Sequence, residues 1–492
     1  MTADSQLAVN VIGYLRDTLG LAEAAHLYIR ALSAAGISVS TTTVSPDLPV
    51  DPNVGPTITR HGHHPYEERR ASVEPAFNLA CVNGDQLAAL MRSRTEGILE
   101  GRRTIGQWAW ETDVLPPSWN EGFGYVEEIW VYSTFVAENL GRLAPVPVVV
   151  VPQAIAVPDP SGVELELARD QRFTFLFMLD FFSTLRRKNP LGLVEAFKRA
   201  FAPDEGPRLL LKTINSEFRP EAREELRSKI GGRPDIELID GFLEARQKTA
   251  LLARADCYVS LHRSEGFGLT LGESMALGTP VIATGYSGNT DFTMPHNSYL
   301  VDWTSTRVGP GCEVYPAEGS WAEPDLDHAA ELMRRVWQRP EEARAKADRA
   351  RLDIQRLYAP EVVGRLARAR LERLADRRMI ASARPSASDV AVLSDLRLAD
   401  VESELAFDPA RGAQPMRRGP RGVLRRLVLR LMLPFTAHER DLDRAMAEAL
   451  RALHAELARE RALRAEDRAR VERLEERLRE LEASSRERGR ER

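Results

Sequence analysis

The stretch of sequence that decides the fold is residues 264–283, SEGFGLTLGESMALGTPVIA. It places Glu265 beside glycines and Glu273 eight positions later, inside an apolar run. The preceding apolar residues, CYVSL, predict a buried strand, and the spacing that follows predicts a helix from Leu269 to Gly278. A strand, a glycine-containing loop and a helix in this order are typical of one unit of a parallel sheet.

This loop and helix start have the chemistry of a binding site. Glycines let the backbone approach a ligand closely, and the free N–H groups at a helix start suit a phosphate. Ionised carboxylates accept hydrogen bonds, so they match the hydroxyl pairs of sugars and ribose. We expect Glu265 and Glu273 to line one pocket at different depths. The alternative is that Glu273 only complements the helix dipole and Glu265 is a solvated loop charge.

The length and charge of the chain indicate how many domains it has and which partners it attracts. A chain of 492 residues with 43% hydrophobic residues is long enough for two globular domains and additional segments. The formal net charge is -5, from 67 Lys and Arg against 72 Asp and Glu, which gives no overall attraction to nucleic acid. Binding partners are therefore inferred from local features.

Cysteine content and the N-terminus favour a cytoplasmic protein. The three cysteines are odd in number and far apart, so we expect buried free thiols in a reducing compartment rather than a disulfide framework. The N-terminus lacks a basic segment followed by an apolar one, and no apolar run of 18 residues occurs. The cysteines are Cys81, Cys257 and Cys312.

Candidate strands alternate with helices in two series of similar size. The first series has strands at 7–14, 37–44, 78–82, 103–108, 128–132 and 146–151. The second has strands at 172–179, 208–213, 236–239, 256–261 and 280–284. A proline-rich connection at 151–162 separates them, and beyond Ala322 three helices are predicted, each opened by a proline. This pattern predicts two doubly wound α/β sheets that face one another across a ligand crevice.

The string EGFGLTLGESMALGTPVIAT at 265–284 resembles the donor-site signature of glycosyltransferase family 4. That family has two glutamates with seven residues between them, Gly-Phe-Gly after the first, and Ala-x-Gly-x-Pro-Val after the second. The resemblance covers about residues 8–378 and implies a GT-B fold, which is two facing Rossmann-like domains. It implies that Glu273 binds the ribose of a nucleotide and that Glu265 binds the transferred sugar. Main-chain contacts to the donor are expected from Gly266, Phe267, Gly268 and Leu269.

A basic group precedes the helix that is predicted to start near Pro190. It consists of Arg186, Arg187 and Lys188. Cations beside a helix start can neutralise a diphosphate leaving group. By resemblance, Lys188 matches the family's lysine, but Phe182 stands where the family usually has an arginine. We expect Arg187 or Arg186 to replace that arginine, the alternative being an exposed basic helix start.

The first domain is expected to meet the donor across the crevice. Gly20 follows the first strand in a loop that resembles the family's glycine loop, although a plain strand-to-helix turn is the alternative. That loop lacks G-x-G-x-x-G, which argues against a nicotinamide cofactor. The region where many relatives carry a cleft histidine has none. Instead, Trp108, Trp110 and Glu111 are acceptor candidates, with core packing as the alternative for each tryptophan.

The resemblance also implies a retaining reaction that needs neither a protein nucleophile nor a metal. We therefore expect no cofactor and no metal site. Two D-x-D strings, Asp325-Leu326-Asp327 and Asp441-Leu442-Asp443, lie in predicted helices and fit surface charge better than metal binding. The histidines at 61, 63 and 64 lack a second ligand cluster.

The C-terminal part predicts three further segments. Residues 379–410 read as a linker, and 411–436 form a basic amphipathic segment suited to an anionic membrane interface. Residues 437–492 carry a heptad pattern that predicts a coiled coil and a homo-oligomer. The alternatives are a helix docked on the protein body or on a partner, and a solvated single helix. No nucleic-acid reading motif accompanies the arginines.

The sequence thus predicts a first Rossmann-like domain over 1–155, on the acceptor side, and a nucleotide-sugar-binding domain over 156–378. The expected protein is a cytoplasmic glycosyltransferase, peripheral at the inner face of the cell membrane, with a glycan or lipid-linked acceptor. Its expected pathway is cell-surface polysaccharide or O-antigen assembly. Two alternatives stay open, namely a sugar-nucleotide epimerase of the same fold and an inactive transferase-like membrane scaffold.

Overall fold

The structure is a computed structural model that describes residues 7–17, 20–44, 66–93, 97–165, 172–312 and 314–381. The amphipathic segment, the coiled coil and the three histidines at 61, 63 and 64 lie outside these residues. The same is true of the linker, except that its first three residues continue the last helix. Residues 1–376 form one compact unit.

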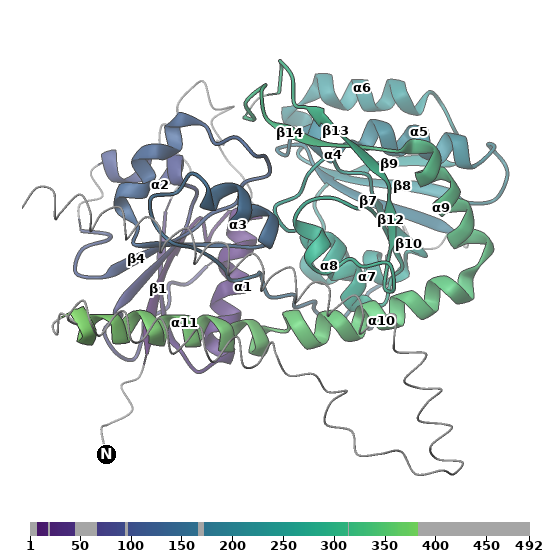
Figure 1. Ribbon diagram of the computed structural model, residues 1–492. Helices are drawn as coiled ribbons and strands as arrows, with labels where there is room; N and C mark the ends of the chain where they lie inside the picture. Colours follow the sequence, from purple (N-terminus) through teal and green to yellow (C-terminus); the bar gives the residue numbers. More distant parts are fainter. Residues whose placement is uncertain are drawn as a thin grey trace, which may run out of the picture. The chain divides into compact units, whose positions relative to one another are not determined.

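The first domain is a six-stranded parallel sheet with helices (Figure 1). Its strand order is β2-β1-β3-β4-β5-β6, so the direction of strand addition reverses between β1 and β3. Each of the six predicted strands is confirmed. The elements are β1 (Ala8–Gly13), α1 (Gly20–Ala34), β2 (Ser38–Thr43), β3 (Phe77–Cys81), α2 (Gly84–Arg92), β4 (Arg103–Gln107), a 3-10 helix (Pro117–Tyr125), β5 (Glu128–Val131), α3 (Thr134–Gly141) and β6 (Val148–Val150).

The second domain is also a six-stranded parallel sheet, with the order β12-β11-β10-β7-β8-β9. Its direction of strand addition reverses between β7 and β10. All five predicted strands are confirmed, and the sheet gains β12. The elements are β7 (Thr174–Asp180), α4 (Leu185–Lys188), α5 (Pro190–Ala200), β8 (Arg208–Ile214), a 3-10 turn (Ser216–Phe218), α6 (Pro220–Ile230), β9 (Ile236–Asp240), α7 (Ala245–Arg254), β10 (Cys257–Ser260), α8 (Leu269–Leu277), β11 (Val281–Thr284), a 3-10 turn (Gly288–Asp291) and β12 (Tyr299–Val301).

Local sequence signals explain the boundaries of these helices. Prolines open α5 and α6, where the first N–H groups of a helix have no intrahelical partner. Gly278 ends α8 with φ +77°, a left-handed conformation that favours glycine. The helix α9 (Leu326–Gln338) begins differently from the prediction, because Asp325 caps it by accepting hydrogen bonds from Asp327 N and His328 N. Asp325 is therefore a helix cap.

An antiparallel hairpin follows the second sheet and was not predicted. It consists of β13 (Trp303–Arg307) and β14 (Ser320–Pro324). The hairpin contacts the first domain at two places. Ser320 N, at the start of β14, donates to Asp113 Oδ1 at 2.6 Å, and Tyr315, in the connection between the two strands, packs on Trp110 at 5.2 Å between ring centroids. The hairpin therefore joins the two domains beside the crevice.

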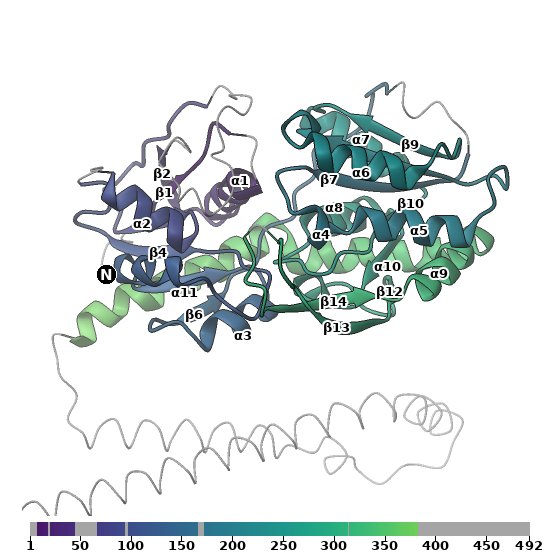
Figure 2. The same ribbon diagram turned by 90° about the horizontal axis from the view of Figure 1, so that it is seen from above.

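The last helices close the unit across both domains (Figures 1 and 2). Helix α10 (Pro340–Tyr358) contacts α8 of the second domain. Helix α11 (Pro360–Ala381), which the sequence analysis placed in the second domain, packs against the first. Its Arg370 donates to Glu128 at 2.8 Å, and Arg368 donates to Ala35 O at 3.0 Å. The last described helix thus returns to the first domain.

Candidate active site

The candidate site lies where both sheets reverse their strand order. In parallel α/β sheets, ligands bind at the carboxyl ends of the strands at this switch point. Gly20 follows β1 and Asn83 follows β3 in the first domain, while Thr184 and Glu265 come after β7 and β10 in the second. All four residues line one cavity, so loops from both switch points form its wall.

The cavity has a volume of about 660 Å³, which is within the usual range for small-molecule sites. Its walls include all four main-chain candidates, Gly266, Phe267, Gly268 and Leu269. Gly268 has φ +91° and comes directly before helix α8, so the first N–H groups of that helix lie beside the cavity. This arrangement suits a phosphate group.

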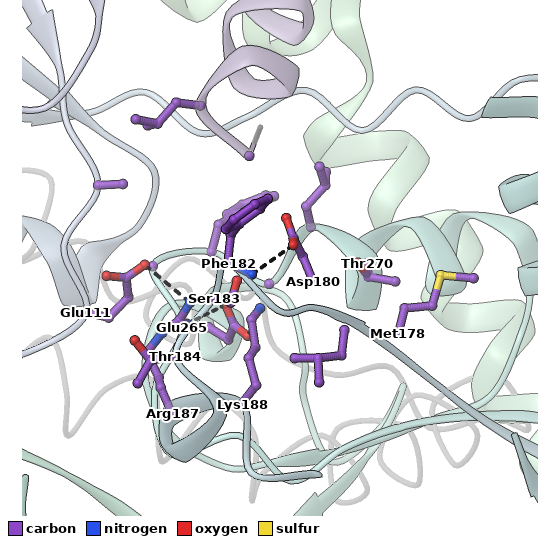
Figure 3. Close-up of a pocket in the computed structure, with 18 of the residues that line it drawn as sticks. Glu111, Met178, Asp180, Phe182, Ser183, Thr184, Arg187, Lys188, Glu265 and Thr270 are labelled. Atoms are coloured by element: carbon purple, nitrogen blue, oxygen red, sulfur yellow. Dashed lines mark hydrogen bonds and ion pairs between the residues drawn. The ribbon is translucent and has the colours of Figure 1, made fainter. Parts of the chain in front are cut away.

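Glu265 is the centre of a charged cluster in the wall of this cavity (Figure 3). Lys188 Nζ lies 2.5 Å from Glu265 Oε1, and Arg187 donates to Glu265 Oε2 at 3.1 Å. Short helix α4 carries both cations, and Ser287 Oγ accepts the N–H of Glu265 at 2.8 Å. The carboxylate is therefore fixed by two cations from the β7 loop.

The surroundings of Glu265 keep it ionised. Burial opposes ionisation, but Lys188 and then Arg187 outweigh it and lower the pKa of Glu265 to about 2. For Arg187, burial alone would lower the pKa, yet its anionic neighbours raise it. The cluster therefore holds two positive charges and the Glu265 carboxylate in an enclosed place.

Glu111 brings the first domain into the same cluster. Its Oε1 lies 3.8 Å from Arg187, and its Oε2 accepts the Tyr315 hydroxyl at 2.8 Å. Its main-chain carbonyl accepts Ser264 Oγ at 2.6 Å. The acceptor candidate Glu111 is thus a cavity residue, and both of its carboxylate oxygens already face partners.

Glu273 lies close to the cavity but is not one of its lining residues. Its Oε1 accepts Lys248 Nζ at 2.6 Å, and Lys248 does line the cavity. Its Oε2 is buried and has no hydrogen-bond donor within the described part of the chain. Burial raises the pKa of Glu273, and Lys248 partly offsets this effect. The second glutamate therefore retains an unused acceptor atom.

The two domains meet through main-chain contacts beside Glu265. Ser133 Oγ, at the start of α3, donates to Gly266 O at 2.7 Å. Gly288 packs so closely that a Cβ there would lie 2.1 Å from Gly266 O, so only glycine fits at this position. At the same end of α3, Thr134 N donates to Asp291 at 2.8 Å. These contacts fix the Glu265 loop against the first domain.

Like Glu273, two further site candidates are not among the residues that line the cavity, contrary to the sequence analysis. Trp108 is fully buried in the first domain, where its ring packs on Trp119 at 5.6 Å and Phe123 at 5.1 Å. Arg186 turns toward the hairpin and donates to Val308 O at 2.6 Å and Pro310 O at 2.9 Å. Of the two arginine candidates, Arg187 alone is a lining residue. Trp110, in contrast, does line the cavity.

Several cavity residues were missed by the sequence analysis. Tyr315 lies in the unpredicted hairpin connection, and Lys248 lies on α7, whose surface charges carry no motif. Lys212 is a nearly buried cation on strand β8 whose Nζ donates to Thr213 O at 2.9 Å and also to Gly241 O. A lysine in an otherwise apolar strand, LLLKT, was the one available signal for it.

The described residues also bear on the cysteines, on metal sites and on membrane-spanning helices. Cys81 and Cys257 are free and buried, as predicted, and Cys312 is buried. Across the part of the chain that the structure covers, no group of three or more His, Cys, Asp and Glu side chains is arranged to hold a metal ion. In the same part, no helix has the length and apolar character needed to cross a membrane.

Comparison with known proteins agrees with this architecture. Residues 169–305 match the family model described as glycosyl transferases group 1. A search of curated protein sequences gives no match. Among solved structures, sucrose-phosphate synthase from Thermosynechococcus elongatus matches with 18% identity and a TM-score of 0.53, over 77% of this chain and all of that one.

Two further structures illustrate the range of the likeness. HepE from Anabaena, solved with UDP and glucose, matches with 11% identity and a TM-score of 0.51 over 74% of this chain and 99% of that one. TarM from S. aureus, solved with UDP and other ligands, gives 12% identity and a TM-score of 0.44, over 58% of this chain. The chain spans 53% of that TarM structure. The first two matches show that the fold is shared.

The family match covers the domain that contains Glu265, Lys188 and Arg187, and the fold of residues 7–381 has the two parallel-sheet domains of the GT-B type. The chain therefore matches the glycosyl transferases group 1 family over residues 169–305, within a GT-B fold.

Proposed function

We propose that this protein is a retaining glycosyltransferase that moves a sugar from a nucleotide-diphosphate sugar to a glycan acceptor, without a metal. One observation carries this proposal, namely the cluster of Glu265, Lys188 and Arg187 beside the start of helix α8. Cations and helix N–H groups together suit a diphosphate, and a fixed carboxylate beside them suits sugar hydroxyls. A family match in the same domain supports this reading.

The proposed reaction assigns a role to each group. The bond between the sugar C1 and the phosphate oxygen breaks while the acceptor oxygen bonds to C1 on the same face. The acceptor proton moves to the leaving phosphate oxygen, so no protein base is needed. Lys188, Arg187 and the amides at the start of α8 stabilise the charge that develops on the diphosphate. Because these cations lie where the diphosphate would bind, they supply the role that a metal has in other transferases.

Glu265 would accept hydrogen bonds from the transferred sugar, and Glu273 from the ribose. The free Oε2 of Glu273 supports the second assignment, because a buried acceptor without a donor is costly and a ribose hydroxyl would satisfy it. Gly20 and Trp110 would contact donor and acceptor from the first domain. A lipid-linked acceptor is proposed because residues 411–436 are basic and amphipathic. Such an acceptor would place the protein at the cytoplasmic face of the membrane, in polysaccharide or O-antigen assembly.

The deciding experiment screens nucleotide sugars for thermal stabilisation and then assays sugar transfer to candidate acceptors. We expect at least one nucleotide sugar, for example UDP-glucose, to raise the melting temperature and to be consumed only with an acceptor. Conversion of the donor without an acceptor would instead support an epimerase. No stabilisation by any nucleotide sugar would favour an inactive scaffold and would contradict the proposal.

A further inference from the structure

Arg187 is held by segments that are far apart in the sequence. One terminal nitrogen donates to Ser264 O at 2.8 Å and to Glu265 at 3.1 Å. The other lies 3.8 Å from Glu111 Oε1. Its side chain is 7% exposed, against 22% for Lys188, so water screens it little. Arg187 is thus held partly by Glu111, a residue of the first domain.

Glu111 itself is held at both carboxylate oxygens. Oε1 faces Arg187, and Oε2 accepts the hydroxyl of Tyr315 at 2.8 Å. Tyr315 is buried, and its ring packs on Trp110 at 5.2 Å and on Trp321 at 6.3 Å. The carboxylate is thus oriented by Arg187 of the second domain and by Tyr315 of the hairpin connection. Figure 3 shows Glu111 directed toward Arg187 and Glu265.

The charges of this cluster cancel. Lys188 and Arg187 contribute two positive charges, and Glu265 and Glu111 contribute two negative charges. A diphosphate therefore meets cations whose charge is already compensated. When Glu265 also accepts hydrogen bonds from the sugar, as in the proposed function, Glu111 still faces Arg187. Its carboxylate then limits how strongly the cations attract the phosphates.

We infer that Glu111, held by Tyr315, is a positioning residue that fixes the Arg187 guanidinium at the phosphate end of the cavity and balances its charge. The diphosphate product is then held in place during the reaction and still leaves afterwards. This inference rests on the proposed function. It gives Glu111 a role other than acceptor binding, and it gives the hairpin a role in the site.

Isothermal titration calorimetry of the full chain with inorganic pyrophosphate tests this role. Pyrophosphate has no base or sugar, so it reports on the phosphate end alone. We expect Glu111→Gln to bind pyrophosphate at least threefold more tightly than wild type, because the balancing charge is gone while Ser264 and Glu265 still hold Arg187. Unchanged or weaker binding by this variant would overturn the inference.

The first domain offers a matched control for this substitution. Glu121 also pairs with an arginine, Arg92, and also accepts a tyrosine hydroxyl, from Tyr125 at 3.2 Å. These three residues do not line the cavity. Glu121→Gln is therefore expected to bind pyrophosphate as wild type does. An equal gain in affinity in Glu121→Gln would reveal a general charge effect and would contradict a local role.

The part of Tyr315 is tested by a double-mutant cycle, and if Glu111→Gln does not fold, Tyr315→Phe alone still tests whether its hydrogen bond to Glu111 affects pyrophosphate binding. We expect Tyr315→Phe to change pyrophosphate affinity at least twofold in wild type and to have no effect when Glu111→Gln is already present. No change from Tyr315→Phe in wild type, or equal effects in both backgrounds, would remove Tyr315 from the role.

Turnover separates positioning from acceptor binding. With a donor and acceptor found by the screen, Glu111→Gln is expected to lower kcat at least tenfold without raising the KM for the donor or the acceptor. A higher acceptor KM with kcat retained would return Glu111 to acceptor binding. If wild type binds neither pyrophosphate nor any nucleotide sugar, the proposed function itself fails, whereas normal binding with an unaltered Glu111→Gln variant removes only this inference.

Discussion

Lys188 Nζ lies 2.5 Å from Glu265 Oε1, so the cation proposed for the donor phosphate is paired with the carboxylate proposed for the donor sugar. When the donor binds, Lys188 and Glu265 would exchange their contact with each other for contacts to the phosphate and the sugar of the donor. A carboxylate held by Lys188 and Arg187 is already ionised and oriented before the donor arrives. The pair therefore links recognition of the sugar to recognition of the diphosphate.

The first prediction concerns this pair. Lys188→Met or Glu265→Gln should lower turnover at least a hundredfold, because each removes one main contact to the reacting donor. The measurement is initial-rate transfer with the donor and acceptor found by the screen. Lys198→Met is the control, since Lys198 lies in the same domain on α5 and donates only to Lys229 O in the described residues. Turnover like wild type in Lys188→Met would remove its assigned role.

The second prediction concerns pH. The pKa of Glu265 is lowered from 4.5 to about 2 in the folded protein, so the folded state binds its proton less tightly than the unfolded state. The contribution of Glu265 to stability is therefore complete above about pH 4.5 and is lost as the pH falls toward 2. It is on the order of 3 kcal/mol for a shift of this size.

Urea unfolding of wild type and Glu265→Gln at pH 7, 5 and 3.5 measures this contribution. The difference between their free energies of unfolding should be the same at pH 7 and 5 and smaller at pH 3.5. The Gln side chain does not titrate, so the change in this difference belongs to Glu265. An equal difference at all three pH values would contradict the lowered pKa.

The third prediction separates the two arginines. Arg187→Met should weaken pyrophosphate binding at least tenfold, because it removes an enclosed cation from the cavity wall. Arg186→Met should leave that affinity unchanged and instead lower the melting temperature, because Arg186 holds the hairpin through Val308 O and Pro310 O. Calorimetry and thermal unfolding on both variants give the two readouts. The reverse pattern would show that Arg186 replaces the family arginine.

These two arginines also show which features of the site can be predicted from the sequence and which cannot. The strands, the helix after Glu265 and the basic group before Pro190 are local patterns, so their positions follow from hydrophobic runs, glycines and prolines. The choice between Arg186 and Arg187 does not follow from any such pattern. Neighbouring residues of a short helix point in different directions, and the hairpin that attracts Arg186 is distant in the sequence.

Long-range contacts account for the other differences. Trp108 and Trp110 have the same sequence context, but both follow the end of β4, where strand alternation no longer decides which way a side chain faces. Trp108 packs on Trp119 and Phe123 in the core, and of the two only Trp110 lines the cavity. The hairpin strands β13 and β14 are short and partly polar, so they lack a clear period-2 pattern. The return of α11 to the first domain rests on contacts such as Arg370 with Glu128, 242 positions apart. No local motif encodes such contacts.

The fourth prediction concerns the segment at residues 411–436. Deletion of residues 411–492 should abolish sedimentation with phosphatidylserine-containing vesicles, because each arginine near an anionic surface contributes about 1 kcal/mol. Nucleotide-sugar stabilisation should stay as in the full chain, since the cavity lies within residues 20–315. Neutral phosphatidylcholine vesicles are the control. Persistent binding of the shortened protein to anionic vesicles would remove this segment from the membrane role.

The fifth prediction concerns the aromatic core behind Trp110. Trp108 is fully buried, and a Cβ at Gly106 would lie 2.6 Å from its Nε1, so the backbone of β4 is shaped around this ring. Trp108→Ala should therefore lower the free energy of unfolding by about 3–5 kcal/mol, as for other large core truncations, and Trp108→Phe by less. Urea unfolding measures both. Because Trp108 contacts Trp119 and Phe123 rather than the cavity, the Phe variant should keep the acceptor KM of wild type. A raised acceptor KM with unchanged stability would instead make Trp108 a binding residue and would require the ring to turn out of its core.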